Sequence, residues 1–201
     1  MSKQTLYSKR PNLILGFHGC EETTAKRIVC AEDYLKPSIN DYDWLGNGMY
    51  FWENNYERAL EWAKRSSKIE KPAVLGAVID LGFCMDLMDS EFLKELKKAY
   101  DTLKKTMELA GQPMPTNEGR TPDKLLRKLD CAVIQTVHAM NELSGENVSY
   151  DSVRGVFWEG SELYPNAFFK EKNHIQICVR NPNCIKGYFL PRVIDKNFIV
   201  P

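Results

Sequence analysis

The sequence predicts one α+β domain, and three observations support this. Short apolar, strand-like runs lie near both ends of the chain. The region from about 90 to 145 has a helical pattern instead. The chain has 201 residues, of which 43% are hydrophobic and 27% charged, which is enough for a full core. We therefore expect a single domain over residues 1–201, with a sheet and peripheral helices.

The first part of the chain predicts two strands flanking a short helix. Leu13–His18 is an apolar run that ends at a glycine, as expected for a buried strand. Glu22–Val29 follows as a helix. Lys36–Leu45 is polar and rich in turn-forming residues, which indicates a loop. Gly48–Trp52 is the second strand.

The segment after the second strand predicts another helix. Asn54 is a suitable N-cap, and Glu57 three residues later completes a capping-box-like pair. The expected buried stripe follows the i, i+3, i+4, i+7 rule and consists of Tyr56, Ala59, Leu60 and Ala63. Trp62 lies off this stripe, so its ring is free to face a ligand.

The middle of the chain predicts a buried strand followed by two amphipathic helices. Val74–Leu81 is a near-continuous apolar run, typical of a central strand. Helical spacing then relates Phe92, Leu96, Ala99, Leu103 and Met107, and again Leu126, Leu129, Val133, Val137 and Met140. Thr121-Pro122 resembles an N-cap with proline at the first helical position, and Gly111 and Gly145 resemble C-cap glycines.

Three strands are expected at the end of the chain, at Val153–Trp158, His174–Arg180 and Ile185–Leu190. The fifteen-residue link Glu159–Asn173 is long for a connection within a sheet, and such loops are usually functional. In the second of these strands, alternation puts Ile175, Ile177 and Val179 on one face. The other face carries His174, Gln176, Cys178 and Arg180.

Charge and cysteine content exclude several classes of protein. The formal net charge is +0 and the pI is about 6.8, so no global field draws the chain to nucleic acid or to an anionic membrane. The six cysteines form no C-x-x-C pair, so we expect reduced thiols and no structural metal site. No run approaches the ~20 apolar residues that span a bilayer. We expect a cytoplasmic protein without membrane contact.

Three short motifs point to chemistry. His18-Gly19 ends the first strand, Gly48-x-Tyr50-Phe51 opens the second, and Gln176 lies on a late strand. In this order they resemble the poly(ADP-ribose) polymerase-like branch of the ADP-ribosyltransferases, which is marked by a His, a Tyr and a Glu on three strands. Gln176 falls where that branch usually has its glutamate. The resemblance covers about 10–81 and 150–192, and the helical stretch at about 90–145 is read as an insertion.

The resemblance implies an ADP-ribosyltransferase fold, a split and mostly antiparallel sheet with peripheral helices and the helical insertion. It implies transfer of ADP-ribose from NAD to a macromolecular acceptor, protein or nucleic acid, as mono-ADP-ribosylation with release of nicotinamide. His18 would bind the adenosine ribose, Tyr50 and Trp62 would stack on the nicotinamide, and Gln176 would orient the reacting ribose. The other residues expected in the NAD pocket are Gly19, Gly48 and Phe51.

The resemblance to small, stand-alone members suggests a bacterial toxin or defence effector. Whether an inhibitory partner protein holds it inactive is left open.

The presence of Gln176 in place of a glutamate leaves alternative functions open. An amide oxygen can hold a ribose hydroxyl, but it carries no charge and is no general base. Glu159, Glu162 and Glu171 are the nearby carboxylates in sequence. The chain could instead be an inactive NAD or ADP-ribose binding module, or a NAD glycohydrolase that uses water. In the simplest structural reading, His18, Tyr50, Gln176, His138 and His174 are strand-end, core and surface residues without chemistry.

Overall fold

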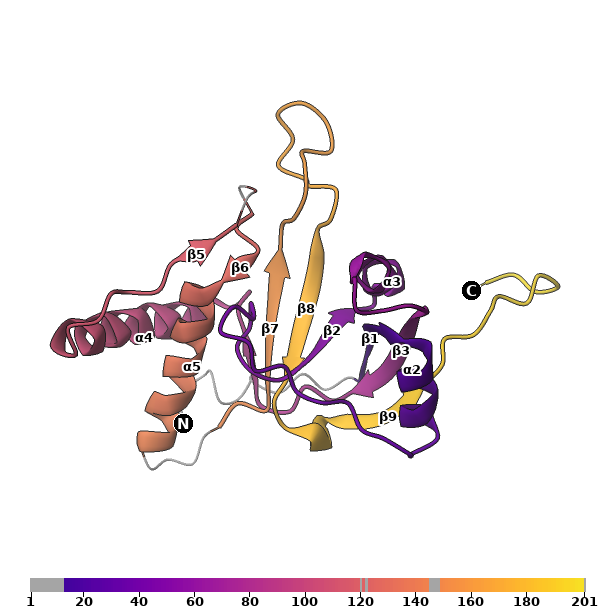
Figure 1. Ribbon diagram of the computed structural model, residues 1–201, viewed down its shortest axis with the longest axis horizontal. Helices are drawn as coiled ribbons and strands as arrows, with labels where there is room; N and C mark the ends of the chain where they lie inside the picture. The colour runs from indigo at the N-terminus through magenta and orange to yellow at the C-terminus, as the bar shows by residue number, and fades with distance from the viewer. Residues whose placement is uncertain (1–12, 120, 122, 145–148, 201) are drawn as a thin grey trace.

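A seven-stranded sheet organises the molecule in the computed structural model, which describes residues 13–119, 121, 123–144 and 149–200 (Figure 1). Its strand order is β4-β7-β8-β2-β1-β3-β9, antiparallel throughout except for the parallel β4–β7 pair. The strands are β1 Ile14–Glu21, β2 Met49–Glu53, β3 Pro72–Ile79, β4 Cys84–Asp86, β7 Ser152–Phe157, β8 His174–Val179 and β9 Ile185–Phe189. The helices are α2 Glu22–Val29, α3 Tyr56–Arg65, α4 Ser90–Leu109 and α5 Lys128–Leu143. The α+β class expected from the sequence is confirmed.

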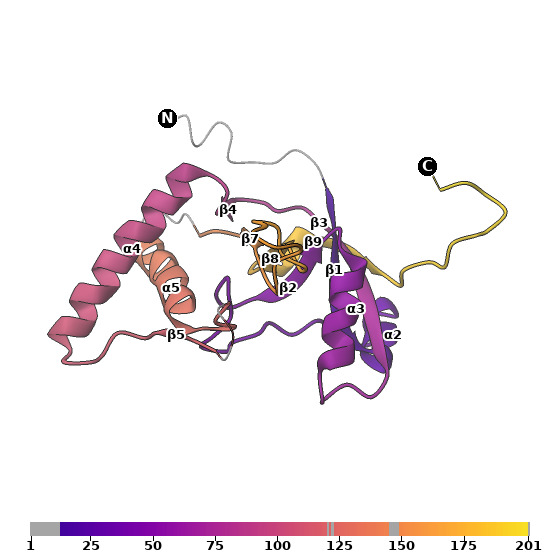
Figure 2. The same cartoon turned by 90° about the horizontal axis from the view of Figure 1, so that it is seen from above.

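The helices cover the two faces of the sheet unequally. α2 packs on one face, over a core that includes Phe51, Leu75 and Ile177. The opposite face carries α3 at one end, over Trp52, and the α4–α5 pair at the other, over Val153. Figure 2 shows the α4–α5 pair and α3 on opposite sides of β2 and β8. A strip of the sheet formed by β2 and β8 therefore lies between two helical walls.

Most element predictions are confirmed, and α2 has the bounds expected from the sequence. The C-terminal glycine of α4 is also confirmed, because Gly111 has a φ of +64° and its N–H donates to the carbonyl of Glu108. The N-cap of α3 was predicted one residue too early. Asn55, not Asn54, accepts from the backbone N–H of Arg58, because Asn54 takes a φ of +46° to turn the chain out of β2.

The start of α5 was also predicted wrongly. The helix begins at Lys128, not at Thr121, because two short strands, β5 Asn117–Glu118 and β6 Leu126–Arg127, form a hairpin directly before it. The side-chain oxygen of Asn117 in β5 accepts hydrogen bonds from the backbone amides of Leu129 and Asp130, in the first turn of α5. Pro122 and Gly145 lie outside the described residues.

The sequence did not predict β4, whose three residues are all buried at the edge of the sheet. Its Asp86 joins a buried ion cluster with Arg154 of β7 and Glu53 at the end of β2. The guanidinium of Arg154 bonds both oxygens of Glu53 and lies 3.1 Å from an oxygen of Asp86. A buried arginine is stable only with such partners. The cluster fixes the end of β2 against the β4–β7 edge.

No helix among the described residues is long and apolar enough to cross a membrane. All six cysteines are free, and five of them are buried.

The α4–α5 pair forms a second core with the sheet. Phe92 and Ala99 of α4 and Ile134 and Val137 of α5 pack against Val153 of the sheet. His138 is 4% exposed in this core, and neither of its ring nitrogens has a hydrogen-bond partner among the described residues. Burial, and to a smaller degree the charge of Arg180, lowers the pKa of His138 to about 3.

We expect His138→Phe to reduce the acid sensitivity of the fold. The folded pKa of His138 lies below the ordinary 6.5, so the unfolded chain binds the proton first and stability is lost as the pH falls below 6.5. Between pH 7.5 and pH 5 this one group lowers the free energy of unfolding by roughly 2 kcal/mol. Urea unfolding of both proteins at the two pH values measures the difference. Equal losses in the variant and the wild type would contradict this role.

Candidate functional site

The strands β1 and β2 separate just where the predicted motifs lie. Their pairing consists of Gly16 with Glu53 and Phe17 with Trp52, and it stops there. On its other side, β1 stays paired with β3 as far as Glu21. The pairing between β1 and β2 is thus absent from His18 onward, which leaves the ladder open there.

His18 lies at the edge of this opening and bonds across it to β2. Its Nδ1 donates to the backbone carbonyl of Tyr50 over 2.8 Å, since a carbonyl oxygen can only accept. In a continuous ladder that carbonyl would accept from the amide of Gly19. Burial lowers the pKa of His18, an effect that the bond to Tyr50 partly offsets. The ring is therefore neutral at pH 7, and its Nε2 is left as a hydrogen-bond acceptor.

Gly19 consequently faces the opening with its backbone. In an antiparallel strand, every second residue directs its amide and carbonyl toward the same neighbouring strand. The carbonyl of Leu15 accepts from the amide of Asn54, so the odd-numbered residues of β1 are the ones that face β2. Gly19 belongs to this set and lies beyond the last pair. It also lets α3 approach, because a Cβ at this position would lie 2.2 Å from the carbonyl oxygen of Ala59.

Tyr50 lies at the other edge of the opening, but its ring points into the sheet face covered by α5. Its hydroxyl donates to the carbonyl of Gly46 over 2.6 Å and accepts from the amide of Leu45 over 2.8 Å. Burial raises the pKa of Tyr50, so the phenol stays neutral. Gly46, with a φ of +78°, forms the turn that these bonds hold. Gly48 allows close contact with β8, since a Cβ there would meet the Sγ of Cys178 at 2.5 Å.

Gln176 lies on the strip of sheet between α3 and α5. It pairs with Trp52 of the neighbouring strand β2. Its half-buried side chain makes no hydrogen bond among the described residues. Trp52 in turn lies 6.1 Å from the ring of Trp62, which is 46% exposed on α3. Trp62 therefore has the accessible ring that the sequence predicted.

The predicted residues do not share one face of the sheet. The strand register puts His18 on the side of Phe51, which is fully buried, and Gln176 on the opposite side with Tyr50 and Trp52. The alternation predicted for β8 agrees with this, because Ile177 and Val179 join the core under α2. Gln176 is also separated from the opening by β2, since it lies on β8 beside Trp52, where β1 and β2 are still paired.

A cluster of aromatic rings that the sequence did not single out surrounds His174, next to Gln176 on β8. His174, two residues earlier on the same face, is 5% exposed, and its ring centroid lies about 6 Å from those of Trp44, Phe157 and Trp52. Its Nδ1 donates to the carbonyl of Lys172 over 2.7 Å. Strand alternation put His174 beside Gln176, but only the structure shows the aromatic rings around it.

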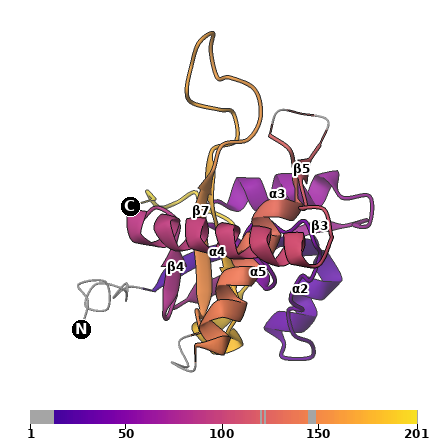
Figure 3. The same cartoon turned by 90° about the vertical axis from the view of Figure 1, so that its left-hand side faces the viewer.

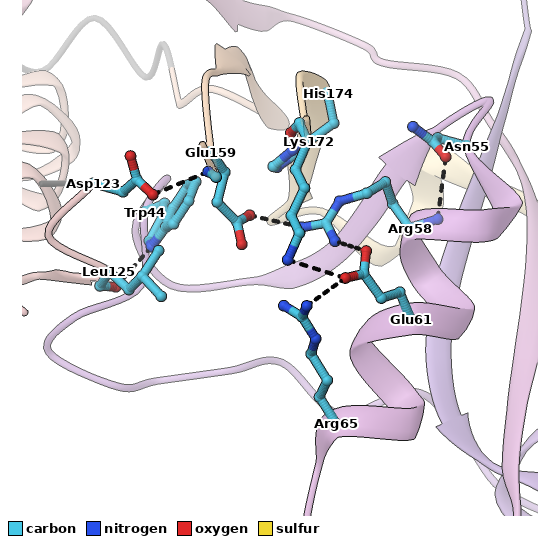
Figure 4. Close-up of polar contacts among 11 residues, drawn as sticks. Trp44, Asn55, Arg58, Glu61, Arg65, Asp123, Leu125, Glu159, Lys172 and His174 are labelled. Atoms are coloured by element: carbon cyan, nitrogen blue, oxygen red, sulfur yellow. Dashed lines mark hydrogen bonds and ion pairs between the residues drawn. The ribbon is translucent and has the colours of Figure 1, made fainter. Parts of the chain in front are cut away.

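Ion pairs join the loop between β7 and β8 to α3 (Figure 4). Arg58 of α3 bonds Glu159 over 2.7 Å and also pairs with Glu61. Lys172 reaches Glu61 over 3.0 Å from the other end of the loop. A hollow of about 500 Å³ lies beside these pairs and is lined by charges of both signs. The base of the loop is thus fixed above the His174 cluster.

Beyond this base the loop projects from the molecule (Figures 1 and 3) and carries exposed apolar rings. Phe168 is 92% exposed, and Trp158, Tyr164 and Phe169 are each more than half exposed. Backbone bonds such as that from the amide of Leu163 to the carbonyl of Phe169 shape the loop from within. Large rings held outward in this way are typical of a binding surface.

Comparison with known proteins finds similarity over most of the chain but assigns no activity. The chain is 28% identical over 204 residues to an uncharacterised protein of Methanocaldococcus jannaschii, and the match covers 91% of each chain. No protein family model matches the chain. No solved structure matches it either.

Gly19→Ala should destabilise the fold far more than Gly187→Ala. The added methyl group collides with the backbone of Ala59 and forces α3 away from β1, whereas a Cβ at Gly187 meets nothing within 4 Å. We expect Gly19→Ala to lower the free energy of unfolding by about 1–3 kcal/mol, and Gly187→Ala to change it by less than about 0.5 kcal/mol. Urea unfolding compares them. Equal effects would mean that α3 is not seated on Gly19.

Proposed function

We propose that this protein transfers ADP-ribose from NAD to a macromolecular acceptor and releases nicotinamide. The observation that carries the proposal is the opening between β1 and β2, bordered by His18 and Gly19, with Gln176 one strand away on β8. These are the positions of the ADP-ribosyltransferase motif in the sequence. The opening lies in a mostly antiparallel sheet of the kind that such a fold requires.

The groups at the opening suit the two halves of NAD. Nε2 of His18 accepts a hydrogen bond from a ribose hydroxyl. The amide and carbonyl of Gly19 match the carbonyl and amino group of a carboxamide such as that of nicotinamide. The ring of Trp62 offers a surface for stacking. A dinucleotide bound at the opening beside His18 would have to extend past β2, over the face that carries Trp52 and Trp62, to reach Gln176 on β8.

Gln176 then orients the reacting ribose through its amide, which has no partner within the described chain. It brings no negative charge to the cationic sugar that forms as the glycosidic bond breaks. The nearby rings of Trp52 and Trp62 supply some of that stabilisation, because aromatic faces attract cations.

The projecting loop between β7 and β8 is the surface for the acceptor. Its exposed rings, above all Phe168, are the kind that dominate recognition of macromolecules. The loop starts and ends beside His174 and Gln176, so an acceptor held by the rings is close to the ribose. This placement favours transfer to a macromolecule over hydrolysis of NAD by water.

His18→Ala and Trp62→Ala should each weaken NAD binding without unfolding the protein. Loss of the His18 acceptor removes one hydrogen bond, about 0.5–1.5 kcal/mol, and loss of the Trp62 ring removes a stacking partner of similar value. The matched control is Tyr34→Ala, which removes another exposed ring on the segment after α2. Isothermal calorimetry with NAD gives the affinities. Unchanged affinity in both site variants would place the site elsewhere.

Gln176→Ala should lower the turnover number by about 100-fold. Its affinity for NAD should change by less than about fivefold. Gln176→Glu should retain transfer and raise NAD hydrolysis, since a carboxylate can also activate water. The assay incubates labelled NAD with whole-cell lysate, then digests with protease or nuclease to identify the acceptor class.

The outcomes separate the alternatives. Nicotinamide release without labelled macromolecules would identify a NAD glycohydrolase. NAD binding without nicotinamide release would identify a binding module.

A further inference from the structure

We propose that His174 is the base that takes the proton from the acceptor during transfer. This proposal rests on the proposed function, and it answers the question that Gln176 raises. A glutamine cannot accept that proton, so another group at the site must do so.

Unpartnered buried nitrogens gather around His174. Six such side-chain nitrogens occur among the described residues, and two of them belong to His138 in the distant core that the α4–α5 pair forms with the sheet. The other four are Nε2 of His174, Nε1 of Trp52, and the Nε atoms of Arg58 and Arg127. Trp52 and Trp44 contact the ring of His174, and Arg127 lies 5.0 Å above the ring of Trp44. Buried polar groups are normally bonded, so such a concentration indicates a place where a ligand binds.

His174 is held in the form that a base requires. Because Nδ1 donates to the carbonyl of Lys172, the free lone pair of the neutral ring is on Nε2. Burial lowers the pKa of His174. The carbonyl of Lys172 and the charge of Glu159 oppose this, while Arg58 adds to it. The ring is therefore unprotonated at neutral pH.

The charged groups nearest the ring are Arg58 of α3 and Glu159 and Lys172 of the loop. Arg127 of β6 lies on the ring of Trp44, which packs against His174. The packed rings of Trp44, Trp52 and Phe157 are neutral. Glu159 can stabilise the imidazolium once it forms, and Arg58 favours its return to the neutral state. Glu159 and Glu171 are less suited as bases, because Glu159 is paired with Arg58 and Glu171 accepts from the amide of Ser161 within the loop.

The step balances without a further reactant. The bond between ribose C1′ and the nicotinamide nitrogen breaks, and nicotinamide leaves with the electron pair as a neutral molecule. An O–H or N–H group of the acceptor forms the new bond to C1′ and gives its proton to Nε2 of His174. The imidazolium then releases the proton to water, one for each ADP-ribose transferred.

Access to Nε2 requires the loop base to move. This atom is shielded from solvent. The ion pairs of Arg58 with Glu159 and of Lys172 with Glu61 tie the loop to α3 near the His174 ring (Figure 4). An acceptor that binds the projecting loop can separate these pairs and reach the ring. The base is then exposed only when an acceptor is present, which limits wasteful hydrolysis of NAD.

The test compares His174→Gln and His174→Phe with the wild type, and uses His138→Phe as the control for loss of another buried histidine. Circular dichroism checks folding, calorimetry gives NAD affinity, and label transfer to lysate gives the rate from pH 5 to pH 9. We expect both His174 variants to bind NAD within about threefold of the wild type, and to transfer label at least about 100-fold more slowly. Because burial lowers the pKa of His174, the wild-type rate should fall only at a pH below the ordinary 6.5 of histidine. The His174 variants should lose this decline, and His138→Phe should keep it.

Added imidazole should restore transfer in His174→Ala in proportion to its concentration, which a purely structural role would not allow. A folded His174 variant with the wild-type rate and the same decline in acid would overturn the proposal and leave NAD transfer standing. A wild-type protein that neither binds nor cleaves NAD would overturn the proposed function and this assignment together.

Discussion

The hydrogen bond from Nδ1 of His18 to the carbonyl of Tyr50 is the interaction on which the site depends. It replaces the ladder bond that would otherwise join β1 to β2, so the strands separate without leaving the Tyr50 carbonyl unpaired. An unsatisfied buried carbonyl would cost about 1–3 kcal/mol, which makes an open sheet expensive without such a partner. The same bond fixes the tautomer of His18 and releases the backbone of Gly19 toward the opening.

The surrounding structure supports this opening from both sides. On one side α3 lies against Gly19, where no side chain fits. On the other, Tyr50 is held by Leu45 and Gly46, over a core shared with α5. The α4–α5 pair thus stabilises the site indirectly, by covering the sheet next to it. The ion pairs between α3 and the β7–β8 loop hold the loop beside the strip of β2 and β8 that carries Gln176.

Sequence reasoning predicted the strands and helices well wherever local pattern decides the outcome. The bounds of α2, the C-cap at Gly111 and the alternation in β8 all follow from spacing and turn chemistry. The start of α5 could not be predicted, because its cap comes from Asn117 across a hairpin. The three-residue β4 is too short to show a period, and it pairs with β7, more than sixty residues later.

The candidate site was predicted in part. His18 and Gly19 border the opening, but no sequence pattern indicated that Gln176 lies one strand away from it and on the other face. That depends on which strands are neighbours. The cluster of His174, Arg58 and Glu159 joins residues about a hundred positions apart, through ion pairs and ring contacts that leave no periodic signal.

The most direct test of the account is amide hydrogen exchange at Gly19, followed by NMR with and without NAD. The split sheet predicts rapid exchange of this amide in the free protein, in contrast to its neighbours His18 and Cys20, whose amides point toward β3. NAD, or nicotinamide alone, should protect it. A Gly19 amide that is already protected without ligand, or one that NAD leaves unchanged, would contradict the claim that the opening between β1 and β2 is the NAD site.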